Sequence, residues 1–183
     1  MAKRIAINGF GRMGRLALRA AWDNPEFEFV HINEIAGQAG TAAHLLEFAS
    51  QHGRWDHDVR SDEQSIEIAG RRISYSSNAA IEDTPWGDMG INLVVECTGN
   101  FKSSESLNPY LQAGISKVVV SAPVKDGTLN IVMGINDHLY EPAEHHIVTA
   151  ASCTTNCIAP VVSVVNEAFG IRHGSITTIH DIT

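Results

Sequence analysis

The stretch that decides the fold is residues 4–22, "RIAINGFGRMGRLALRAAW". It opens with the short apolar segment Arg4–Ile7, which is typical of a buried strand. The apolar residues that follow recur at helical spacing, which predicts a helix over residues 11–22. Residues 27–32, "FEFVHI", are again strand-like, so a strand, a helix and a second strand follow one another within 32 residues. This order, with its short turns, predicts a βαβ unit with parallel strands.

Three glycines stand in the turn between the first strand and the helix: Gly9, Gly11 and Gly14, in the pattern G-x-G-x-x-G. The pattern alone is weak, but here it follows a strand and opens a helix, which is the context in which it binds a dinucleotide. Gly9 permits the tight turn, Gly11 lets the backbone approach a pyrophosphate, and Gly14 allows the helix to pack closely. Free N–H groups and the positive end of the helix dipole add to the attraction for phosphate.

Glu34, in "HINEIAG", follows Gly14 by 20 residues and stands at the end of the second predicted strand. An acid at that place takes the ribose hydroxyls of a dinucleotide, and its charge repels a 2′-phosphate. The sequence therefore predicts an NAD site rather than an NADP site. The alternative is a solvated loop acid on an α/β protein that binds no nucleotide. It is less favoured because strand, glycines, helix and acid are all in place.

The chain continues this alternation of strands and helices up to residue 151. Two β-branched runs, "LVVE" at 93–96 and "KVVVS" at 117–121, are typical of buried parallel strands. The other predicted elements are helices over 41–48 and 103–113, a hairpin over 65–77, and short strands over 131–133 and 147–148. The fold class predicted for residues 1–151 is α/β: a Rossmann-type, mostly parallel sheet with helices on both faces, forming an NAD-binding domain.

The character of the sequence changes at about residue 152. An apolar helix over 157–169 leads through Gly170 to an alternating strand over 175–180, and the chain stops at Thr183. A strand with no closing element after it looks cut. We therefore expect residues 152–183 to be the beginning of a truncated α+β catalytic domain.

Composition and charge limit the classes of partner. Of the 183 residues 44% are hydrophobic, which suffices for a core and argues against disorder. The formal net charge of −8 disfavours a surface for nucleic acid or anionic membrane. No apolar run has the length of a membrane span, and the N-terminus does not resemble a secretory signal. Three cysteines in such a chain indicate free thiols in a reducing compartment, so we expect a cytoplasmic protein.

Two of the cysteines stand close together in residues 151–160, "ASCTTNCIAP". Cys153 and Cys157 are spaced as two of four zinc ligands are, but the sequence holds no second cysteine pair. A disulfide is disfavoured in a reducing compartment. Two small buried cysteines are the commonest arrangement, and a catalytic role is the remaining interpretation.

The catalytic interpretation rests on position along the predicted helix. Ser152 or Thr154 can cap its N-terminus, and Cys153 then lies where the helix dipole favours the thiolate. Cys157 lies a turn further in and is expected to face the packed interior. His180 ends the strand that follows the helix, so the two side chains can meet as nucleophile and base.

The chain resembles glyceraldehyde-3-phosphate dehydrogenases over its whole length, in that family's order and spacing. The matching motifs are "INGFGRMGR", "AHLLEF…HGRW", "ECTG", "VVVSAPVKDG", "IVMGIN", "ASCTTNCIAP" and "TTIHDIT". "SCTTNC" followed by "TTIH" is highly specific for this family and its erythrose-4-phosphate dehydrogenase relatives. The resemblance implies oxidation of glyceraldehyde 3-phosphate with NAD and inorganic phosphate to 1,3-bisphosphoglycerate, through a thioester on Cys153. It also implies that the chain is an N-terminal fragment, inactive alone, of an enzyme that is a homotetramer when full length.

The resemblance further implies a role for individual residues. Cys153 is the nucleophile and His180 is its base. The cofactor residues are Gly9, Phe10, Gly11, Arg12, Met13 and Gly14 in the glycine turn, Glu34 at the adenosine ribose, Thr98 and Gly99 in the groove, and Ser121 near the nicotinamide. The residues that hold the substrate phosphate and inorganic phosphate are Ser152, Thr154 and Thr183. No metal site is expected.

Three positions depart from the family pattern. Glu34 replaces the usual aspartate, a feature associated with erythrose-4-phosphate dehydrogenases and with variants linked to arsenate resistance. Ala49 stands where an aspartate is usual, and Asp181 where a small or aromatic residue is usual. Erythrose 4-phosphate as substrate and arsenate as acceptor therefore stay open as variants of the same chemistry. A catalytically silent NAD-binding module and an NAD-linked thiol sensor stay open as functions of other classes.

Overall fold

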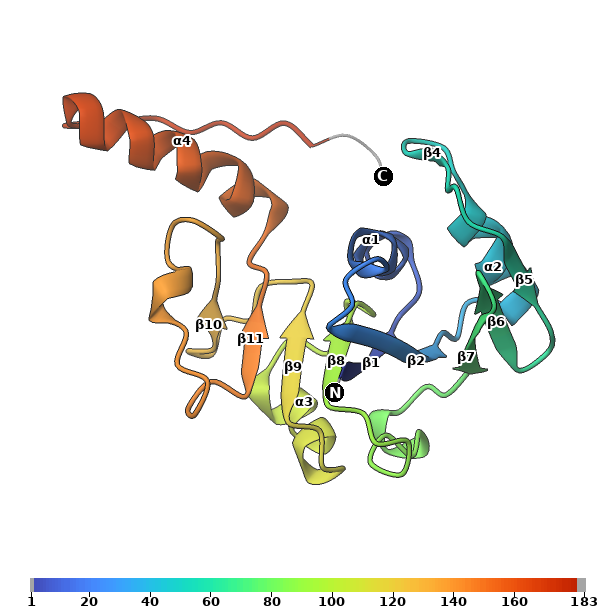
Figure 1. Cartoon of the computed structure of the whole chain (residues 1–183). Helices are drawn as coiled ribbons and strands as arrows, with labels where there is room; N and C mark the ends of the chain where they lie inside the picture. The colour runs from blue at the N-terminus through green and yellow to red at the C-terminus, as the bar shows by residue number, and fades with distance from the viewer. Residues whose placement is uncertain (1, 181–183) are drawn as a thin grey trace.

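The computed structural model describes residues 2–180, and Thr183 of the predicted site therefore lies outside the described residues (Figure 1). Nine strands of this part of the chain form one sheet in the order β10-β11-β9-β8-β1-β2-β7-β6-β5. All pairs from β10 to β7 are parallel, and the pairs β7–β6 and β6–β5 are antiparallel. The strands of this sheet are β1 (Lys3–Asn8), β2 (Phe27–Asn33), β5 (Val59–Ser61), β6 (Ser65–Ile68), β7 (Arg71–Ser76), β8 (Leu93–Glu96), β9 (Lys117–Val120), β10 (Leu129–Asn130) and β11 (Ile147–Thr149).

The helices follow the order expected of βαβ units. They are α1 (Arg12–Ala21), α2 (Ala39–Glu47), α3 (Ser104–Gln112) and α4 (Cys153–Phe169), with short 3-10 turns η1 (Ile81–Asp83) and η2 (Asp137–Leu139). A small separate hairpin of β3 (Phe48–Ala49) and β4 (Gly53–Arg54) follows α2. The predicted Rossmann-type, mostly parallel α/β sheet is confirmed.

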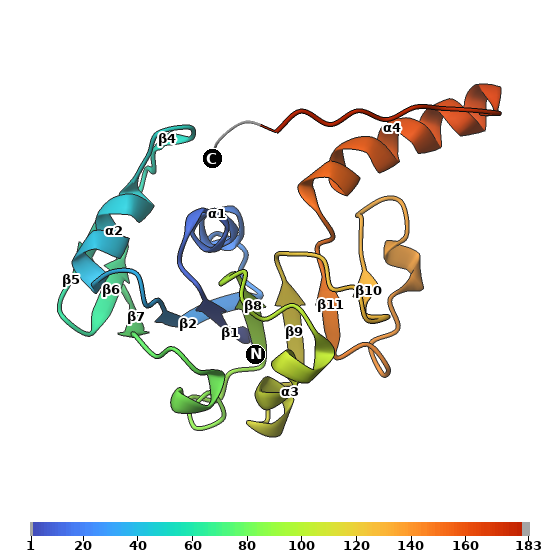
Figure 2. The same ribbon diagram turned by 180° about the vertical axis from the view of Figure 1, so that it is seen from behind.

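Helices cover both faces of the sheet, because side chains of a strand alternate between its two sides. Ile5 and Ile7 of β1 belong to one apolar core with residues of α1 and α2. Ala6, between them, belongs to a second core that includes Leu107 and Tyr110 of α3. Figures 1 and 2 show α1 and α3 on opposite sides of the strands.

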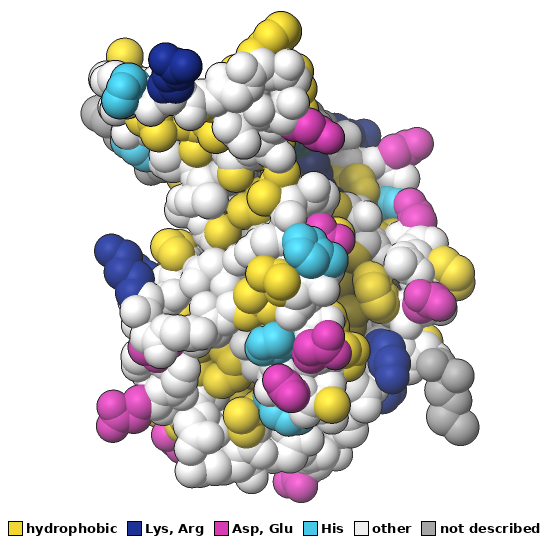
Figure 3. Space-filling model, turned by 90° about the vertical axis from the view of Figure 1, so that its left-hand side faces the viewer, with side chains coloured by type: hydrophobic (Ala, Val, Ile, Leu, Met, Phe, Trp, Pro, Cys, Tyr) yellow, Lys and Arg dark blue, Asp and Glu magenta, His cyan; other side chains and the backbone are white. Residues whose placement is uncertain are grey.

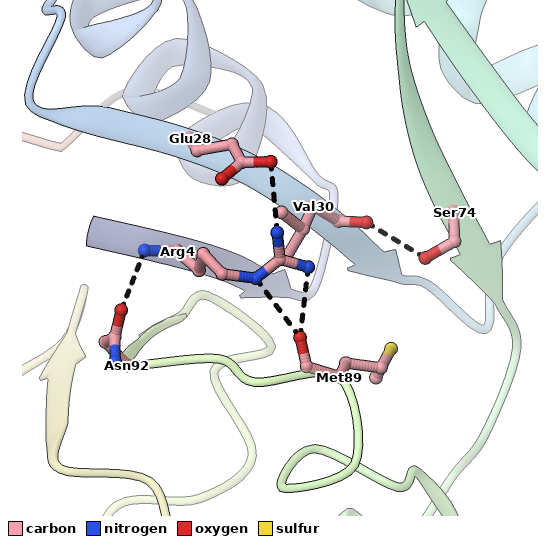
Figure 4. A network of polar contacts seen from close by, with 6 residues as sticks. All are labelled: Arg4, Glu28, Val30, Ser74, Met89 and Asn92. Atoms are coloured by element: carbon pink, nitrogen blue, oxygen red, sulfur yellow. Dashed lines mark hydrogen bonds and ion pairs between the residues drawn. The ribbon is translucent and has the colours of Figure 1, made fainter. Parts of the chain in front are cut away.

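A network of polar contacts at the start of β1 ties the first strand to its neighbours (Figure 4). The Arg4 guanidinium donates to the Met89 carbonyl, at 3.1 and 3.3 Å, and lies 3.0 Å from the Glu28 carboxylate. The Arg4 backbone N–H donates to Asn92 Oδ1 at 2.9 Å. These contacts join β1, β2 and the loop before β8 at the amino ends of the strands, opposite the edge where the predicted site lies.

Two predicted strands differ from the structure. The strand expected over 131–133 is found at Leu129–Asn130, because the Asn136 side chain accepts the Val132 N–H at 2.7 Å and ends the pairing with β11. The strand expected over 175–180 is absent, and these residues are exposed and irregular. An isolated strand has no hydrogen-bond partner for its backbone groups, so an alternating apolar pattern alone does not produce a strand.

Helix α4 projects from the sheet beyond β11 (Figure 1). It carries an exposed apolar surface. In Figure 3 hydrophobic side chains gather on the lobe at the top of the view, which α4 and the residues after it form. Val161, Val164 and Phe169 of this helix are 61%, 66% and 87% exposed. No helix in the described part of the chain is both long and apolar enough to cross a membrane.

Candidate functional site

The glycine turn after β1 is packed so tightly that two of its glycines have no room for a side chain. Gly9 has a φ of 86°, and a Cβ there would collide with the Thr98 backbone nitrogen. A Cβ on Gly14 would collide with the Gly9 carbonyl oxygen. At Gly11, in contrast, a Cβ would meet nothing within 4 Å. The turn is therefore closed on the protein side and open at the position where a phosphate group can approach.

Helix α1 starts at this open position without a capping side chain. Its N-cap is Gly11, its first turn holds no acid, and the Arg15 N–H is bonded to the Gly11 carbonyl at 3.1 Å. The earlier N–H groups of the helix are left for another acceptor, and the dipole makes that acceptor preferably an anion. Arg12, the first residue of α1, also lines a separate hollow of about 470 Å³ together with Arg15 and Arg19.

Glu34 links the glycine turn to the loop after β2. Its carboxylate accepts the Phe10 N–H at 2.6 Å through one oxygen and the Ala36 N–H at 2.7 Å through the other. Each oxygen keeps a second acceptor position. The carboxylate is thus held at the carboxyl end of β2 with capacity left for the hydroxyls of a ribose.

A cavity of about 270 Å³ lies between these elements, at the carboxyl ends of β1, β2 and β8. Gly9, Gly11, Glu34 and Thr98 line it, as the sequence predicted. β2 pairs with one edge of β1, and β8, which comes much later in the chain, pairs with the other. Crevices at such a switch point are where open α/β sheets bind their ligands. The open position at Gly11, the uncapped start of α1 and the Glu34 carboxylate suit the pyrophosphate and a ribose of a dinucleotide.

Several residues of this cavity were missed by sequence reasoning. Among them are Asn8, Asn33, Asn78 and Phe101. The first two are the last residues of β1 and β2, and this position at a strand end is the signal that could have identified them. Met13 is half-exposed on α1, and Gly99 follows Thr98 with a φ of 71°.

Cys97 lies beside Thr98 in the wall of the cavity and is a free thiol. Burial raises the pKa of Cys97 to about 11, against a lowering contribution from its hydrogen bond with Ser121. This thiol stays protonated near neutral pH and is a poor nucleophile. Ser121 itself follows β9 and donates its backbone N–H to the Glu96 carbonyl at 2.9 Å, next to the same cavity.

Cys153 is the first residue of α4 and is exposed. The preceding residue, Ser152, is the N-cap: its hydroxyl accepts the Thr155 N–H at 3.0 Å. Of the two capping residues considered from the sequence, the structure selects Ser152, and Thr154 lies in the first turn, half-buried. The thiol thus stands at the positive end of a helix that has no acid in its first turn.

The turn before α4 is held by side chains. Ala151 is buried and adopts a φ of 55°, in the left-handed region that favours glycine. The Asn156 side-chain amide donates to the carbonyls of the two residues that flank Ala151: Ala150 at 2.7 Å and Ser152 at 2.9 Å. The Thr149 hydroxyl accepts the Ala151 N–H at 2.9 Å. These three bonds fix the direction in which α4, and with it Cys153, leaves the sheet.

One expectation about the thiol site is wrong for this chain, and a second stays a prediction. Cys157 does not face a packed interior but is exposed, because the side of α4 that carries it has no neighbour among residues 2–180. His180 lies in the irregular segment after α4, and within the described residues no hydrogen bond joins it to Cys153. The expected meeting of the two side chains depended on the strand over 175–180, which does not form.

The interpretations of the cysteines as metal ligands or disulfide partners can also be compared with the structure. Cys97, Cys153 and Cys157 are all free thiols. Within the described part of the chain, no group of three or more His, Cys, Asp and Glu side chains is placed to hold a metal ion.

Family comparison assigns both parts of the chain. Residues 3–104 match the model described as "Glyceraldehyde 3-phosphate dehydrogenase, NAD binding domain", and residues 152–183 match "Glyceraldehyde 3-phosphate dehydrogenase, C-terminal domain". The chain belongs to the glyceraldehyde 3-phosphate dehydrogenase family. Its cofactor is NAD, as the match to the family's NAD-binding domain and the fit of the cavity indicate.

Curated members of the glyceraldehyde 3-phosphate dehydrogenase family are similar over the whole chain. It is 60% identical to glyceraldehyde-3-phosphate dehydrogenase 3 of Nostoc sp. (strain PCC 7120 / SAG 25.82 / UTEX 2576) over 183 residues. It is 44% identical to the enzyme of Geobacillus stearothermophilus and 42% identical to glyceraldehyde-3-phosphate dehydrogenase 1 of Bacillus subtilis (strain 168). In each case all of this chain and 54% of the relative are covered, so the chain spans about half the length of the curated relatives it matches.

Proposed function

We propose that this chain supplies the NAD site and the nucleophile of a phosphorylating aldehyde dehydrogenase, which oxidises glyceraldehyde 3-phosphate to 1,3-bisphosphoglycerate. The observation that carries the proposal is the position of Cys153. It is an exposed thiol at a helix N-terminus. The strand that precedes it, β11, pairs in parallel with β9, which pairs in parallel with β8, and β8, β1 and β2 are also parallel. Parallel strands end at the same edge of a sheet, so the thiol follows a strand end on the edge that carries the NAD cavity.

In the proposed reaction Cys153 acts as the nucleophile. Its sulfur bonds to the aldehyde carbon, and the carbonyl oxygen takes up a proton to give a hemithioacetal. His180 is the proposed base that takes the hydroxyl proton as the carbon is oxidised. NAD, when bound, accepts the hydride that leaves this carbon. The resulting thioester is cleaved by inorganic phosphate, whose oxygen bonds to the acyl carbon while the sulfur leaves as the thiolate.

The start of α4 also offers the groups that bind phosphate and stabilise negative charge. The backbone N–H groups of the first turn face a developing oxyanion at the carbon bonded to Cys153. Ser152, Thr154 and Thr183 are the proposed hydroxyl ligands of the substrate phosphate and inorganic phosphate. Ser152 performs this role in addition to capping the helix, since a hydroxyl both accepts and donates.

For the whole protein we propose the assembly and location expected of such an enzyme: a homotetramer in the cytoplasm. The apolar surface of α4 is where we propose that the rest of the catalytic domain packs. Ordering of the segment after α4 by that domain brings His180 to Cys153.

A second candidate function applies to this chain taken alone. The residues that line the NAD cavity all lie between Asn8 and Phe101, and none of them belongs to the thiol site. The chain alone is therefore proposed to bind NAD without turning over an aldehyde.

The experiment that tests the proposed reaction is NADH formation by the full-length gene product with each aldehyde and each acceptor. We expect rapid NADH formation with glyceraldehyde 3-phosphate and inorganic phosphate, and slower formation with erythrose 4-phosphate. Arsenate replaces phosphate because it offers the same oxygens to the thioester. A preference for erythrose 4-phosphate would change the substrate but not the chemistry. Absence of NADH with either sugar phosphate would refute the dehydrogenase.

A further inference from the structure

Glu96, at the carboxyl end of β8, is a buried carboxylate that the proposed reaction does not use. It is 1% exposed. One of its oxygens accepts the Thr98 N–H at 2.7 Å and the Thr98 hydroxyl at 2.5 Å. The other accepts the Tyr110 hydroxyl at 2.6 Å and the Asn8 side-chain amide at 3.1 Å. All acceptor positions of the carboxylate are therefore occupied by donors.

The contacts of Glu96 continue through a chain of side chains across the sheet. Asn8 Oδ1 accepts the Asn33 amide at 2.7 Å. Asn33 Oδ1 in turn accepts the Asn78 backbone N–H at 2.8 Å and the Ser76 hydroxyl at 2.7 Å. Asn8, Asn33, Asn78 and Thr98 all line the cavity assigned to NAD. The hydrogen bonds that begin at Glu96 thus run beneath the cavity from β8 to the loop after β7.

The location is costly for a charge, because none of the four donors is a cation. Burial raises the pKa of Glu96, while hydrogen bonds from Thr98, Tyr110 and Asn8 act in the opposite direction. A carboxylate is nevertheless the one side chain of this size that accepts hydrogen bonds on both of its sides. A glutamine accepts on one side only and presents two N–H donors on the other.

Thr98 connects Glu96 directly to the glycine turn. The Gly9 Cα packs so closely on the Thr98 backbone nitrogen that no Cβ fits between them, and this same nitrogen donates its hydrogen to Glu96. A displacement of Thr98 therefore displaces Gly9 as well. The wall and the phosphate-binding turn of the cavity share one anchor.

We propose that Glu96 is a positioning residue for the cofactor: acting through Thr98 and Asn8, its carboxylate holds the wall and the floor of the cavity in the geometry that binds NAD. The inference rests on NAD being the cofactor and not on the proposed aldehyde reaction, so a failure of one leaves the other standing.

The test compares Glu96→Gln with Tyr110→Phe in this chain, by calorimetric titration with NAD and by thermal unfolding. In Glu96→Gln the amide N–H groups oppose either Thr98 or Asn8. Leaving one buried hydrogen-bond partner unsatisfied costs about as much free energy as a tenfold change in affinity, so we expect NAD binding to weaken by about that factor. Tyr110→Phe removes a donor to the same carboxylate, and with it the hydroxyl that lies 2.5 Å from the Asn8 amide, but it leaves both Glu96 oxygens as acceptors for Thr98 and Asn8. It should lower the unfolding temperature and leave NAD affinity unchanged.

Glu96→Asp provides a second variant that keeps the charge. The shorter side chain reaches Thr98 or the pair of Asn8 and Tyr110, but not both, and we expect an affinity between those of the wild type and Glu96→Gln. A purely structural role would make NAD affinity of all three variants insensitive to the substitution while the unfolding temperatures fall. That pattern, or equal losses of affinity in Glu96→Gln and Tyr110→Phe, would overturn the proposal.

Discussion

At the scale of the residue, every buried polar side-chain atom among the described residues 2–180 has a hydrogen-bond partner, and His31 is the clearest case. Its two ring nitrogens lie 2.8 Å from the Ser74 hydroxyl and 2.9 Å from the Ser76 hydroxyl, and its ring meets the edge of Trp86. Burial lowers the pKa of His31 to about 4. No cation or anion faces the ring in these contacts, so the imidazole is held neutral by desolvation.

The state of His31 predicts how stability depends on pH. The unfolded chain takes up a proton at this residue below about pH 6.5, and the folded chain does so only near pH 4. The stability that neutral His31 contributes is therefore fully present above the pKa of the unfolded state, and it is lost as the pH falls toward the pKa of the folded state. The expected loss is about 2 kcal/mol at pH 5 relative to pH 7. Urea unfolding at the two pH values measures it.

The matched control for this prediction is His31→Gln, which keeps hydrogen bonding to the two serines without a titrating group. Its unfolding free energy should change less between pH 7 and pH 5 than that of the wild type. An equal change in both proteins would assign the pH dependence to other residues.

At the scale of the element, the junction between β11 and α4 determines where the proposed nucleophile, Cys153, lies. The junction combines an unfavourable left-handed residue, Ala151, with an amide that bridges its neighbours, Asn156. A left-handed backbone costs about 1–2 kcal/mol for a residue other than glycine. The hydrogen bonds of Asn156 offset this cost.

Two substitutions at this junction are predicted to act in opposite directions. Ala151→Gly relieves the backbone and should raise the unfolding free energy by about 1 kcal/mol. Asn156→Ala leaves two carbonyls without their side-chain donor and should lower it by about 1–2 kcal/mol. Urea unfolding followed by circular dichroism tests both. Effects of the same sign would show that Ala151 and Asn156 do not oppose one another.

The elements also show what the sequence could and could not predict. β8 and β9 were found within a residue of their predicted ends, because buried parallel strands are short β-branched runs. The strand over 175–180 was not found, because alternating apolar residues predict which side of a strand is buried but do not supply the neighbouring strand that it must pair with. The glycine turn and Glu34 followed from spacing along the chain. Glu96 did not, since its partners come from β1 and α3 and meet only in the folded sheet.

At the scale of the whole molecule, a parallel sheet gathers the ends of strands far apart in the sequence onto one edge. Gly9 follows β1, Glu34 follows β2, Thr98 follows β8 and Cys153 follows β11. The NAD cavity and the exposed thiol therefore share that edge, while Arg4 and its contacts close the other. Helix α4 carries the thiol on a lobe with an exposed apolar surface. The remaining half of the longer relatives has no counterpart in this chain.

The central claim is that Cys153, and not Cys157 one turn further along α4, performs the chemistry beside bound NAD. The most direct measurement is NADH formation by the full-length gene product carrying Cys153→Ser or Cys157→Ser, with NAD affinity measured on the same samples. We predict that Cys153→Ser abolishes NADH formation and binds NAD as the wild type does, and that Cys157→Ser retains both. Full turnover by Cys153→Ser would contradict the account.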